Sequence, residues 1–344
     1  MLLVLLAGCA SPPPPKAPQI EPPLEDQSAA TDYDLANINT ALRNADDLDA
    51  QGNRIAAAYL VESARAKLSQ GATRENLYLD VILASIWGRE GEGRDAEKAN
   101  DYLQRVQAAA VGDARLRGDA GLAQTAVHLG APNLHAAQAS AQLALSGFAQ
   151  AKAWVVYAGA CRQLTGGFLD GGDTATALKI ARQGARVCDQ LKLPLLQLKA
   201  WVDVADLEAA TDPQAADAAF LRAYSAAYRH GKRGWLSIVV ASAVEAFHTR
   251  GHHALAAKWG DRCRDDQTGE LPRLEESGLQ APDYAALLGQ YGLALAAARP
   301  GDTRKQALLE AAKAALEAVE TPGPEIKALH KDVEGALLQS GSGK

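Results

Sequence analysis

Residues 199–227, KAWVDVADLEAATDPQAADAAFLRAYSAA, contain two stretches in which apolar residues recur every three or four positions. This spacing is typical of an amphipathic α-helix, because it places the apolar side chains on one face. Between the stretches lie Asp212, which can cap a helix, and Pro213, which is favoured in a first helical turn. The segment therefore predicts two helices, near 194–210 and 213–230, joined by a short turn.

The same pattern of helical periodicity and short punctuation extends through the chain from about residue 31. Alanine is abundant and aromatic residues make up only 5% of the chain, which favours closely packed helices over a β-sandwich or barrel. The sequence predicts an all-α protein, a right-handed α-solenoid of antiparallel helix hairpins. Helices are expected near 31–50, 53–70, 73–90, 94–110, 113–129, 133–147, 150–165, 173–191, 194–210, 213–230, 233–250, 253–266, 282–298, 303–320 and 324–339.

The opening stretch also carries a recurring pattern of large and small residues. The residues are Trp201, Val204 and Ala205 on the first helix and Ala216, Phe220 and Ala223 on the second, with weaker copies at Trp154-Tyr157-Ala158, Ala177-Ala181-Gly184 and Trp235-Ile238. This pattern resembles the tetratricopeptide repeat, whose regular period is about 34 residues. The small residues let paired helices approach closely. The resemblance covers residues 150–266 best.

The resemblance implies a curved face built from the first helix of each hairpin, and such faces bind extended peptides or partner helices. In the family, the position two residues before the Trp commonly faces this groove, and here it holds Lys152, Lys199 and Arg233. All three are basic, which predicts a positive strip for an acidic peptide or a terminal carboxylate. The alternative is a set of solvated side chains whose stems cover apolar neighbours.

The tryptophans have two interpretations as well. Trp154, Trp201 and Trp235 offer faces on which a sugar or a peptide ligand can stack. At helical spacing beside alanines, however, a Trp is more typical of core packing. We therefore expect these three, together with Trp87 and Trp259, in the core.

The amino-terminal residues run from an apolar stretch into a single cysteine and four prolines, LLAGCASPPPP at 5–15. Residues 2–8 are too few for a transmembrane helix, which needs roughly 20 residues. Leu6-Ala7-Gly8-Cys9 resembles the lipobox of bacterial lipoproteins, which implies cleavage before Cys9 and lipidation of its sulfur and new amino group. Two or more acyl chains give a stable membrane anchor.

The residues around this motif indicate where such an anchored chain lies. The apolar run is short and no Lys or Arg precedes it, so we expect residues 1–8 to be the end of a longer signal peptide. Seven prolines between residues 11 and 30 predict an extended tether. Ala10 and Ser11 stand where an aspartate would resemble the inner-membrane retention signal. The expected location is the outer membrane, facing the periplasm.

Three cysteines remain once Cys9 is lipidated: Cys161, Cys188 and Cys263. An oxidising compartment favours disulfides, but an odd number cannot all pair. In a helix hairpin, Cys161 and Cys188 are offset by roughly 15 Å, which exceeds disulfide reach. We expect three buried thiols that behave as small hydrophobic side chains.

Patterns for catalysis, metals and cofactors point away from an enzyme. The sequence has no Gly-x-Ser-x-Gly, His-Glu-x-x-His, phosphate-binding loop or Cys-x-x-Cys. Glu245-x-x-His248 with His252 and His253 supplies one of the two Glu-x-x-His pairs that a di-iron bundle needs, so we interpret it as an exposed turn. The glycine-rich segment 166–173 matches no calcium-loop spacing and is interpreted as a flexible connection capped by Asp173. We expect no metal and no cofactor.

Charge and composition complete the functional prediction. With 41 acidic against 35 basic residues and no basic cluster, nucleic acid is an unsuitable partner. We expect a lipid-anchored periplasmic scaffold for proteins of the bacterial envelope, such as those of secretin assembly, cell-wall enzyme regulation or polysaccharide export. The alternative is a solenoid that binds a peptide or a cell-wall glycan fragment. The expected divisions are 1–8 signal peptide, 9–30 lipidated tether, 31–149 degenerate hairpins, 150–266 tetratricopeptide-like repeats, 267–340 C-terminal hairpins and 341–344 tail.

Overall fold

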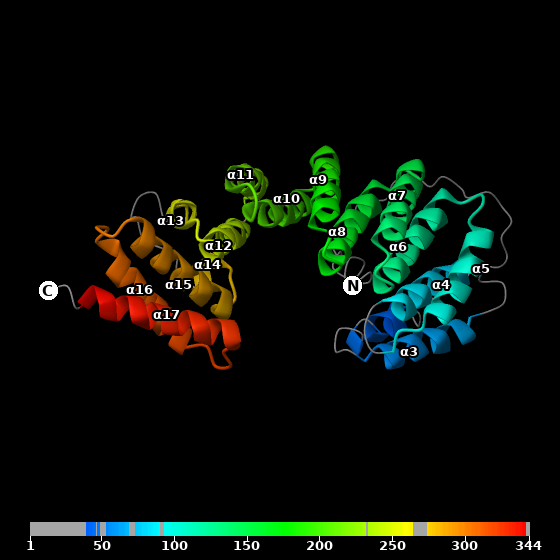
Figure 1. The fold of residues 1–344 in the computed structure, drawn as a ribbon, viewed down its shortest axis with the longest axis horizontal. Coiled ribbons are helices and arrows are strands. Elements are labelled where there is room, and N and C mark those ends of the chain that lie inside the picture. Colours follow the sequence, from blue (N-terminus) through cyan, green and yellow to red (C-terminus); the bar gives the residue numbers. More distant parts are fainter. Residues whose placement is uncertain are drawn as a thin grey trace. The chain divides into compact units, whose positions relative to one another are not determined.

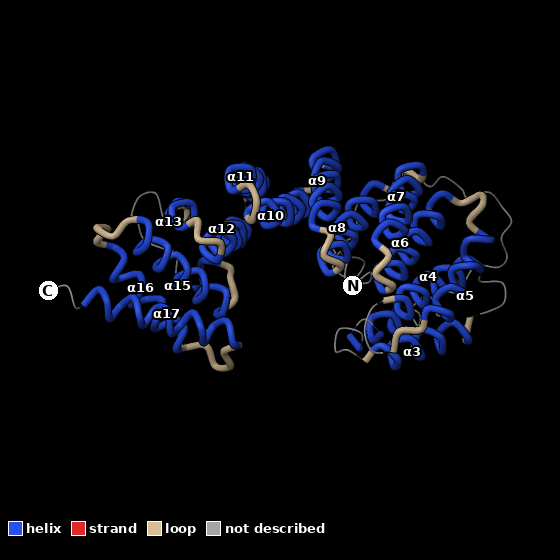
Figure 2. Tube along the Cα trace, in the orientation of Figure 1, coloured by secondary structure: helices blue, strands red, loops and turns tan. Residues whose placement is uncertain are grey.

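The structure, a computed structural model, describes residues 39–45, 47–48, 53–68, 73–89, 93–231, 233–263 and 274–341. Within these ranges every regular element is a helix and none is a strand (Figures 1 and 2). The prediction of an all-α protein is thereby confirmed. None of the helices in the described ranges is both long enough and apolar enough to span a membrane. The described ranges leave out Cys9 and the proline-rich segment, so lipidation and the tether stay predictions.

The chain divides into two compact units, Met1–Ile180 and Ala181–Lys344, and the boundary falls inside one helix, α9. In unit 1 the helices are α3 (Arg54–Ala66), α4 (Thr73–Gly88), α5 (Ala96–Ala109), α6 (Ala114–Gly130), α7 (Leu134–Gln150), α8 (Trp154–Asp170) and the start of α9 (Thr174–Leu191). Unit 2 contains the rest of α9 and α10 (Pro194–Ala209), α11 (Pro213–His230), α12 (Arg233–Thr249), α13 (His253–Asp261), α14 (Leu274–Ser277), α15 (Ala281–Ala298), α16 (Arg304–Glu317) and α17 (Pro324–Gly341).

Consecutive helices from α3 to α8 and from α10 to α13 contact each other, and so do several alternate helices. In unit 1, α4 lies against α6 and α6 against α8, while α5 and α7 lie on α4, α6 and α8. We call α4, α6 and α8 the A helices of unit 1 and α5 and α7 its B helices. In unit 2, α10 and α12 form the corresponding A row, with α11 and α13 as B helices. Each unit is therefore a stack of antiparallel hairpins, as the sequence predicted.

The helices recur at a regular interval that the aromatic motifs did not reveal. From α6 to α13 they begin at residues 114, 134, 154, 174, 194, 213, 233 and 253, so successive starts are 20 residues apart, or 19 in one case. Two steps make a hairpin period of about 40 residues, against about 34 in a regular tetratricopeptide array. The structure therefore shows a helical repeat with a longer period than a regular tetratricopeptide array.

Three-residue turns that follow α7, α8 and α12 are built alike. The middle residue of each has a positive φ, at 52° in Lys152, 79° in Gly172 and 78° in Gly251. The third residue donates its backbone N–H to a carbonyl oxygen five residues earlier, at 2.8–2.9 Å. Glycine adopts this conformation freely, whereas Lys152 is constrained to it by the turn. These turns fix where each helix starts.

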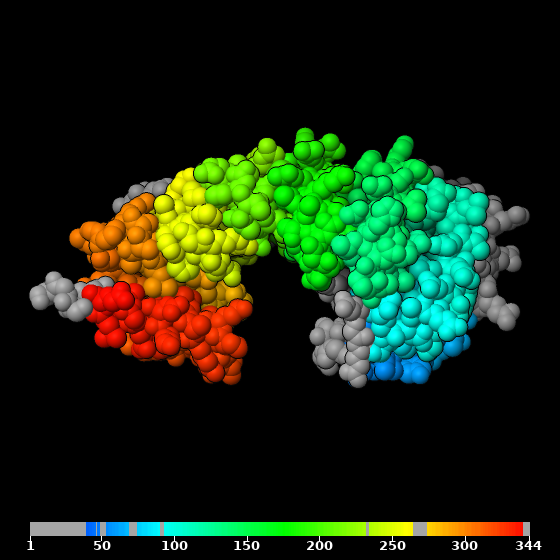
Figure 3. All heavy atoms as spheres, in the orientation of Figure 1, coloured from blue at the N-terminus to red at the C-terminus, as the bar shows by residue number. Residues whose placement is uncertain are grey.

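The closest helix contact in unit 1 joins α6 to α7. A Cβ added to Gly147 would lie 2.5 Å from the backbone nitrogen of Gly118, and one added to Gly121 would lie 2.7 Å from that of Ala144. Only glycine permits this approach. Phe148 of α7 lies fully buried beside Gly118. The side chains of α6 and α7 consequently form one continuous surface in the space-filling view (Figure 3).

The core of unit 2 contains the residues quoted first. All six residues of the Trp201 pattern, from Trp201 to Ala223, are buried, and Asp212 accepts a hydrogen bond from the backbone of Ala215 as the predicted cap. The Phe220 ring lies 5.6 Å from Phe247 and 5.7 Å from Trp259, centroid to centroid, in edge-on geometry. The prediction of a helix hairpin at this place is confirmed.

The weaker copy Ala177-Ala181-Gly184 is buried as predicted, whereas the copies that contain Trp154 and Trp235 are buried only in part. The side chain of Trp154 is 41% exposed, and Trp235 is half-buried and stacked on His230 at 4.2 Å. Ile238 is also 41% exposed, whereas its neighbour Val239 is fully buried. The prediction that every Trp belongs to the core is therefore wrong for Trp154. The turns set the helix starts, and these do not follow the spacing of the tryptophans.

Two further local expectations are corrected. The glycine-rich segment 166–173 is not a loop over its whole length, because α8 continues to Asp170; Asp173 does cap α9, accepting from the backbone of Thr176 at 3.0 Å. Cys161 and Cys188 are buried free thiols as predicted, whereas Cys263 is half-buried.

Candidate functional site

The A helices of unit 1 carry a pocket of about 420 Å³ that we call the A-face pocket. Its apolar wall consists of Leu122, Ala126 and Leu129 from α6 and Leu164 from α8. The helical period brings the α6 residues to one face, because they are three or four positions apart. The pocket therefore lies on the face that the repeat resemblance assigned to ligand binding.

Glycines on α8 make this pocket hollow. Gly166, Gly167 and Gly171 all line it. A Cβ on Gly167 would lie 2.9 Å from Cδ1 of Leu129, and one on Gly171 would lie 3.3 Å from its Cδ2. Each glycine inside a helix costs about 1 kcal/mol relative to alanine. Two adjacent glycines in α8 thus weaken the helix and let the end of Leu129 lie close to its backbone.

The polar rim of the A-face pocket carries charges of both signs. Arg54 and Arg89 lie on one side, and Nη1 of Arg54 donates to the carbonyl oxygen of Arg89 at 2.8 Å. Gln163 and Asp170 of α8 lie on the other side. The pocket thus combines an apolar wall with two guanidinium groups and one carboxylate. Its volume lies within the range of about 300–1,000 Å³ that is common for ligand sites.

The three basic residues predicted to form a groove have different structural settings. Lys152 is an exposed turn residue two positions before α8, and Lys199 is an exposed residue in the second turn of α10. Arg233 is the first residue of α12, and its side chain is outside the described part of the structure. Lys152 belongs to unit 1 and the other two to unit 2. The three positions are not equivalent within their helices, and none lines the A-face pocket.

A second cavity in unit 1, about 310 Å³ in volume, is lined mainly by charged and polar residues. We call it the polar cavity. Its walls are the first turns of α4 and α6 and the helical residues 39–45, and its lining residues are Asn39, Leu42, Arg74, Glu75, Tyr78, Asp113, Arg115, Leu116 and Asp119.

Asp119 is the buried charge of this cavity, with only 8% of the residue exposed. Its Oδ2 accepts a hydrogen bond from Nε of Arg115, one helical turn earlier, at 3.2 Å. Burial raises the pKa of Asp119 from 3.8 to about 6, against the lowering effect of Arg115. Burial and the nearby Asp119 also raise the pKa of Tyr78. Perturbed groups inside a cavity are typical of functional sites.

The histidines after Glu245 do not form a ligand set in the described structure. His248 and His253 have ring centroids 5.2 Å apart, on either side of the turn at Gly251. Burial lowers the pKa of His248, and the neighbouring His253 lowers it further. His252 is the N-cap residue of α13, and its ring lies edge-on to the ring of Phe247. The segment turns between α12 and α13, but His248, His252 and His253 are half-buried, so the prediction of an exposed turn is wrong for these side chains.

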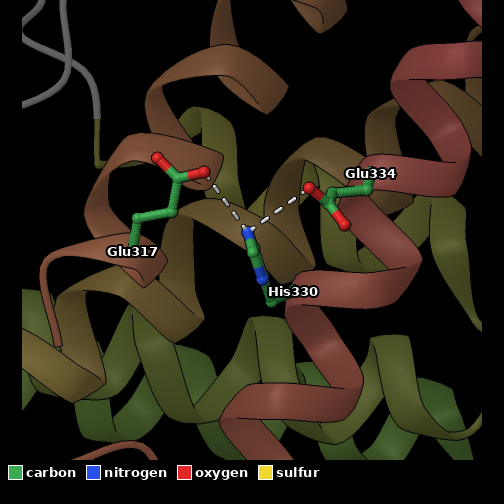
Figure 4. Close-up of side chains that lie close together, drawn as sticks. All are labelled: Glu317, His330 and Glu334. Carbon is green, nitrogen blue, oxygen red and sulfur yellow. Dashed lines mark ion pairs between the residues drawn. The ribbon is translucent and has the colours of Figure 1, made fainter.

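A cluster that the sequence analysis missed joins Glu317 of α16 to His330 and Glu334 of α17 (Figure 4). Nε2 of His330 points between the two carboxylates, 3.8 Å from Glu317 and 3.9 Å from Glu334. Nζ of Lys313 lies 2.9 Å from the same Glu334 oxygen and 3.8 Å from Glu317. Because a lysine already supplies the positive charge there, the cluster is better explained as an ion-pair network between the two helices than as a metal site.

Comparison of the chain with known protein families and with curated proteins finds no match. The class of protein is therefore defined by the fold alone: an all-α protein of stacked helix hairpins with a period of about 40 residues. Its function has to be argued from the pockets and from the sequence.

Proposed function

We propose that this protein is a lipid-anchored scaffold of a bacterial envelope complex, and that it binds a segment of a partner protein in the A-face pocket. The observation that carries the proposal is this pocket of about 420 Å³ on the A helices. Stacked hairpins present such faces to extended peptides and to helices. In this proposal the protein assembles other proteins and performs no chemistry itself.

The composition of the pocket indicates what kind of segment it accepts. Leu122, Leu129 and Leu164 give an apolar surface for an aliphatic side chain. Arg54 and Arg89 supply two positive charges at the rim against one carboxylate, Asp170. A partner segment that carries an aliphatic residue beside an acidic one complements both features. Lys152 and Lys199 are then solvated surface residues, the alternative that the sequence analysis left open.

The docking proposal is tested with a photoreactive amino acid placed at Gln163, which lines the pocket. The matched control is the same amino acid at Glu97, an exposed residue of the B helix α5. In cells of the source bacterium, the Gln163 position should form a crosslink to one defined protein that the Glu97 position does not form. Equal crosslinking from both positions, or none from either, would refute docking in the pocket.

The anchor is proposed from Cys9 alone, and it places the scaffold on the periplasmic side of the outer membrane. Cells fed an alkyne fatty acid should label the wild-type chain and the Cys263→Ala variant, but not Cys9→Ala, because the acyl chains are attached through residue 9. Membrane fractionation should release only the Cys9→Ala variant. Persistent labelling of Cys9→Ala would contradict the anchor.

A further inference from the structure

We infer that the polar cavity of unit 1 binds a small zwitterion of the α-amino-acid class, with its ammonium group at Asp119 and its carboxylate at Arg74 and Arg115. The inference goes beyond scaffolding, because it assigns a small-molecule site. The polar cavity and the A-face pocket have no lining residue in common. Each proposal can therefore fail without the other.

The proposed position of the ammonium group is based on two hydrogen-bond acceptors, one on Asp119 and one on Tyr78. Asp119 uses only Oδ2 in its bond to Arg115, and its Oδ1 makes no hydrogen bond with any described residue. The hydroxyl of Tyr78 likewise makes none within the described ranges, although Tyr78 lines the same cavity and interacts electrostatically with Asp119. A buried carboxylate is costly unless it is paired and hydrogen-bonded. Asp119 is already paired with Arg115, and an ammonium group would supply donors to its remaining oxygen and to Tyr78.

The carboxylate side rests on two guanidinium groups. Arg115 binds Asp119 through Nε, and its two terminal nitrogens make no hydrogen bond with described residues. The guanidinium lies over the ring of Phe148 at 5.5 Å, which restricts its plane. Arg74, an exposed residue of α4, lines the cavity and acts electrostatically on Asp119. Guanidinium groups suit carboxylates because two parallel N–H donors match two oxygens.

A comparison within unit 1 separates this arrangement from an ordinary buried ion pair. Asp80 of α4 is also buried, at 2% exposure, and is also paired with an arginine. Its Oδ2 accepts a hydrogen bond from Nη2 of Arg65 at 3.3 Å, and its Oδ1 lies 2.6 Å from Nε of Arg65 as an ion pair without a hydrogen bond, so one arginine contacts both oxygens. Asp80 lines neither the A-face pocket nor the polar cavity. Asp119 instead has one engaged oxygen and a cavity beside the other.

The size of the cavity limits the ligand. At about 310 Å³ it lies at the low end of the range for ligand sites, about 300–1,000 Å³. This space suits a single amino acid or the end of a short peptide. Glu75 and Asp113 add two further carboxylates to the lining, so the cavity carries both signs of charge near the starts of two helices.

The test is titration calorimetry of the purified full chain with the twenty common amino acids and the D-enantiomers of the nineteen chiral ones. We expect at least one to bind, and we expect its N-acetyl and carboxamide derivatives to bind at least about tenfold more weakly, since each derivative loses one charged hydrogen-bonding group. Asp119→Asn should weaken binding by a similar factor, whereas Asp80→Asn should not.

Arg74→Gln is a second, independent variant for this experiment, because Arg74 is exposed and its replacement leaves the core intact. It should weaken binding of the free amino acid but not change the weak binding of the carboxamide. The inference is overturned if none of the amino acids binds, if the blocked derivatives bind equally well, or if both Asp119→Asn and Arg74→Gln bind like the wild type.

Discussion

Replacing Asp119 with asparagine should reduce the dependence of stability on pH. Burial raises the pKa of this carboxyl group from 3.8 to about 6, so the folded protein holds the proton more tightly than the unfolded chain. Ionised Asp119 therefore costs stability, and the cost develops as the pH rises from about 4 to about 6. A shift of this size corresponds to about 3 kcal/mol at 1.36 kcal/mol per pKa unit. Asparagine does not titrate and has nearly the same shape.

The assay is urea unfolding, followed by far-ultraviolet circular dichroism, at several pH values between about 4 and about 7. Other carboxyl groups with shifted pKa values titrate in both proteins, so their effects cancel in the difference between wild type and variant. That difference should move by about 2–3 kcal/mol in favour of Asp119→Asn as the pH rises. Asp206→Asn, which changes an exposed ion pair, is the control and should show a change below about 1 kcal/mol. Parallel curves for wild type and Asp119→Asn would refute the assignment of Asp119 as a buried, strained charge.

Three further predictions concern the core. Phe220→Ala should lower the free energy of unfolding by about 3–5 kcal/mol, because it removes a fully buried ring. Tyr228→Ala, at an exposed position on the same helix, should change it by less than about 0.5 kcal/mol. Similar denaturation midpoints for the two variants would contradict this packing. Burial raises the pKa of Cys188 to about 11, so a thiol reagent should label it only after unfolding, and rapid labelling of the native protein would count against its burial. Gly121→Val should destabilise the protein by more than about 1 kcal/mol in thermal unfolding, because its Cβ would lie 2.7 Å from the backbone of α7. Gly112→Ala should leave the stability unchanged, because a Cβ at this position has no neighbour within 4 Å. Equal effects of the two variants would exclude close packing of α6 on α7.

The fold was predictable because helical periodicity is a local property of the sequence. Asp212 caps α11 and Pro213 begins it, and both follow from local chemistry. The alignment of repeats on tryptophans failed for a structural reason. Trp154 is the first residue of α8, whereas Trp201 lies two turns into α10, because the turns and not the aromatic residues set the helix starts.

The pockets were less accessible to sequence reasoning, because their residues are distant in the chain. The A-face pocket joins Arg54, α6 and α8, and its depth depends on Gly167, which the sequence presented as part of a loop. The pair Arg115 and Asp119 does have a visible signal, the four-residue spacing of opposite charges on one helix face. Only the packing of α4 beside α6 shows that this pair borders a cavity with Tyr78.

The central claim is that a partner protein occupies the A-face pocket, and filling the pocket tests it most directly. Gly167→Leu places a side chain beside Leu129, whose flexible end can move, and it favours the helix by about 1 kcal/mol, so the fold should persist. The measurement is the yield of the crosslink from position 163 to the partner protein. This yield should fall at least about tenfold in Gly167→Leu and remain unchanged in Gly112→Leu. Undiminished capture by Gly167→Leu, in a chain that circular dichroism shows to be folded, would contradict the account.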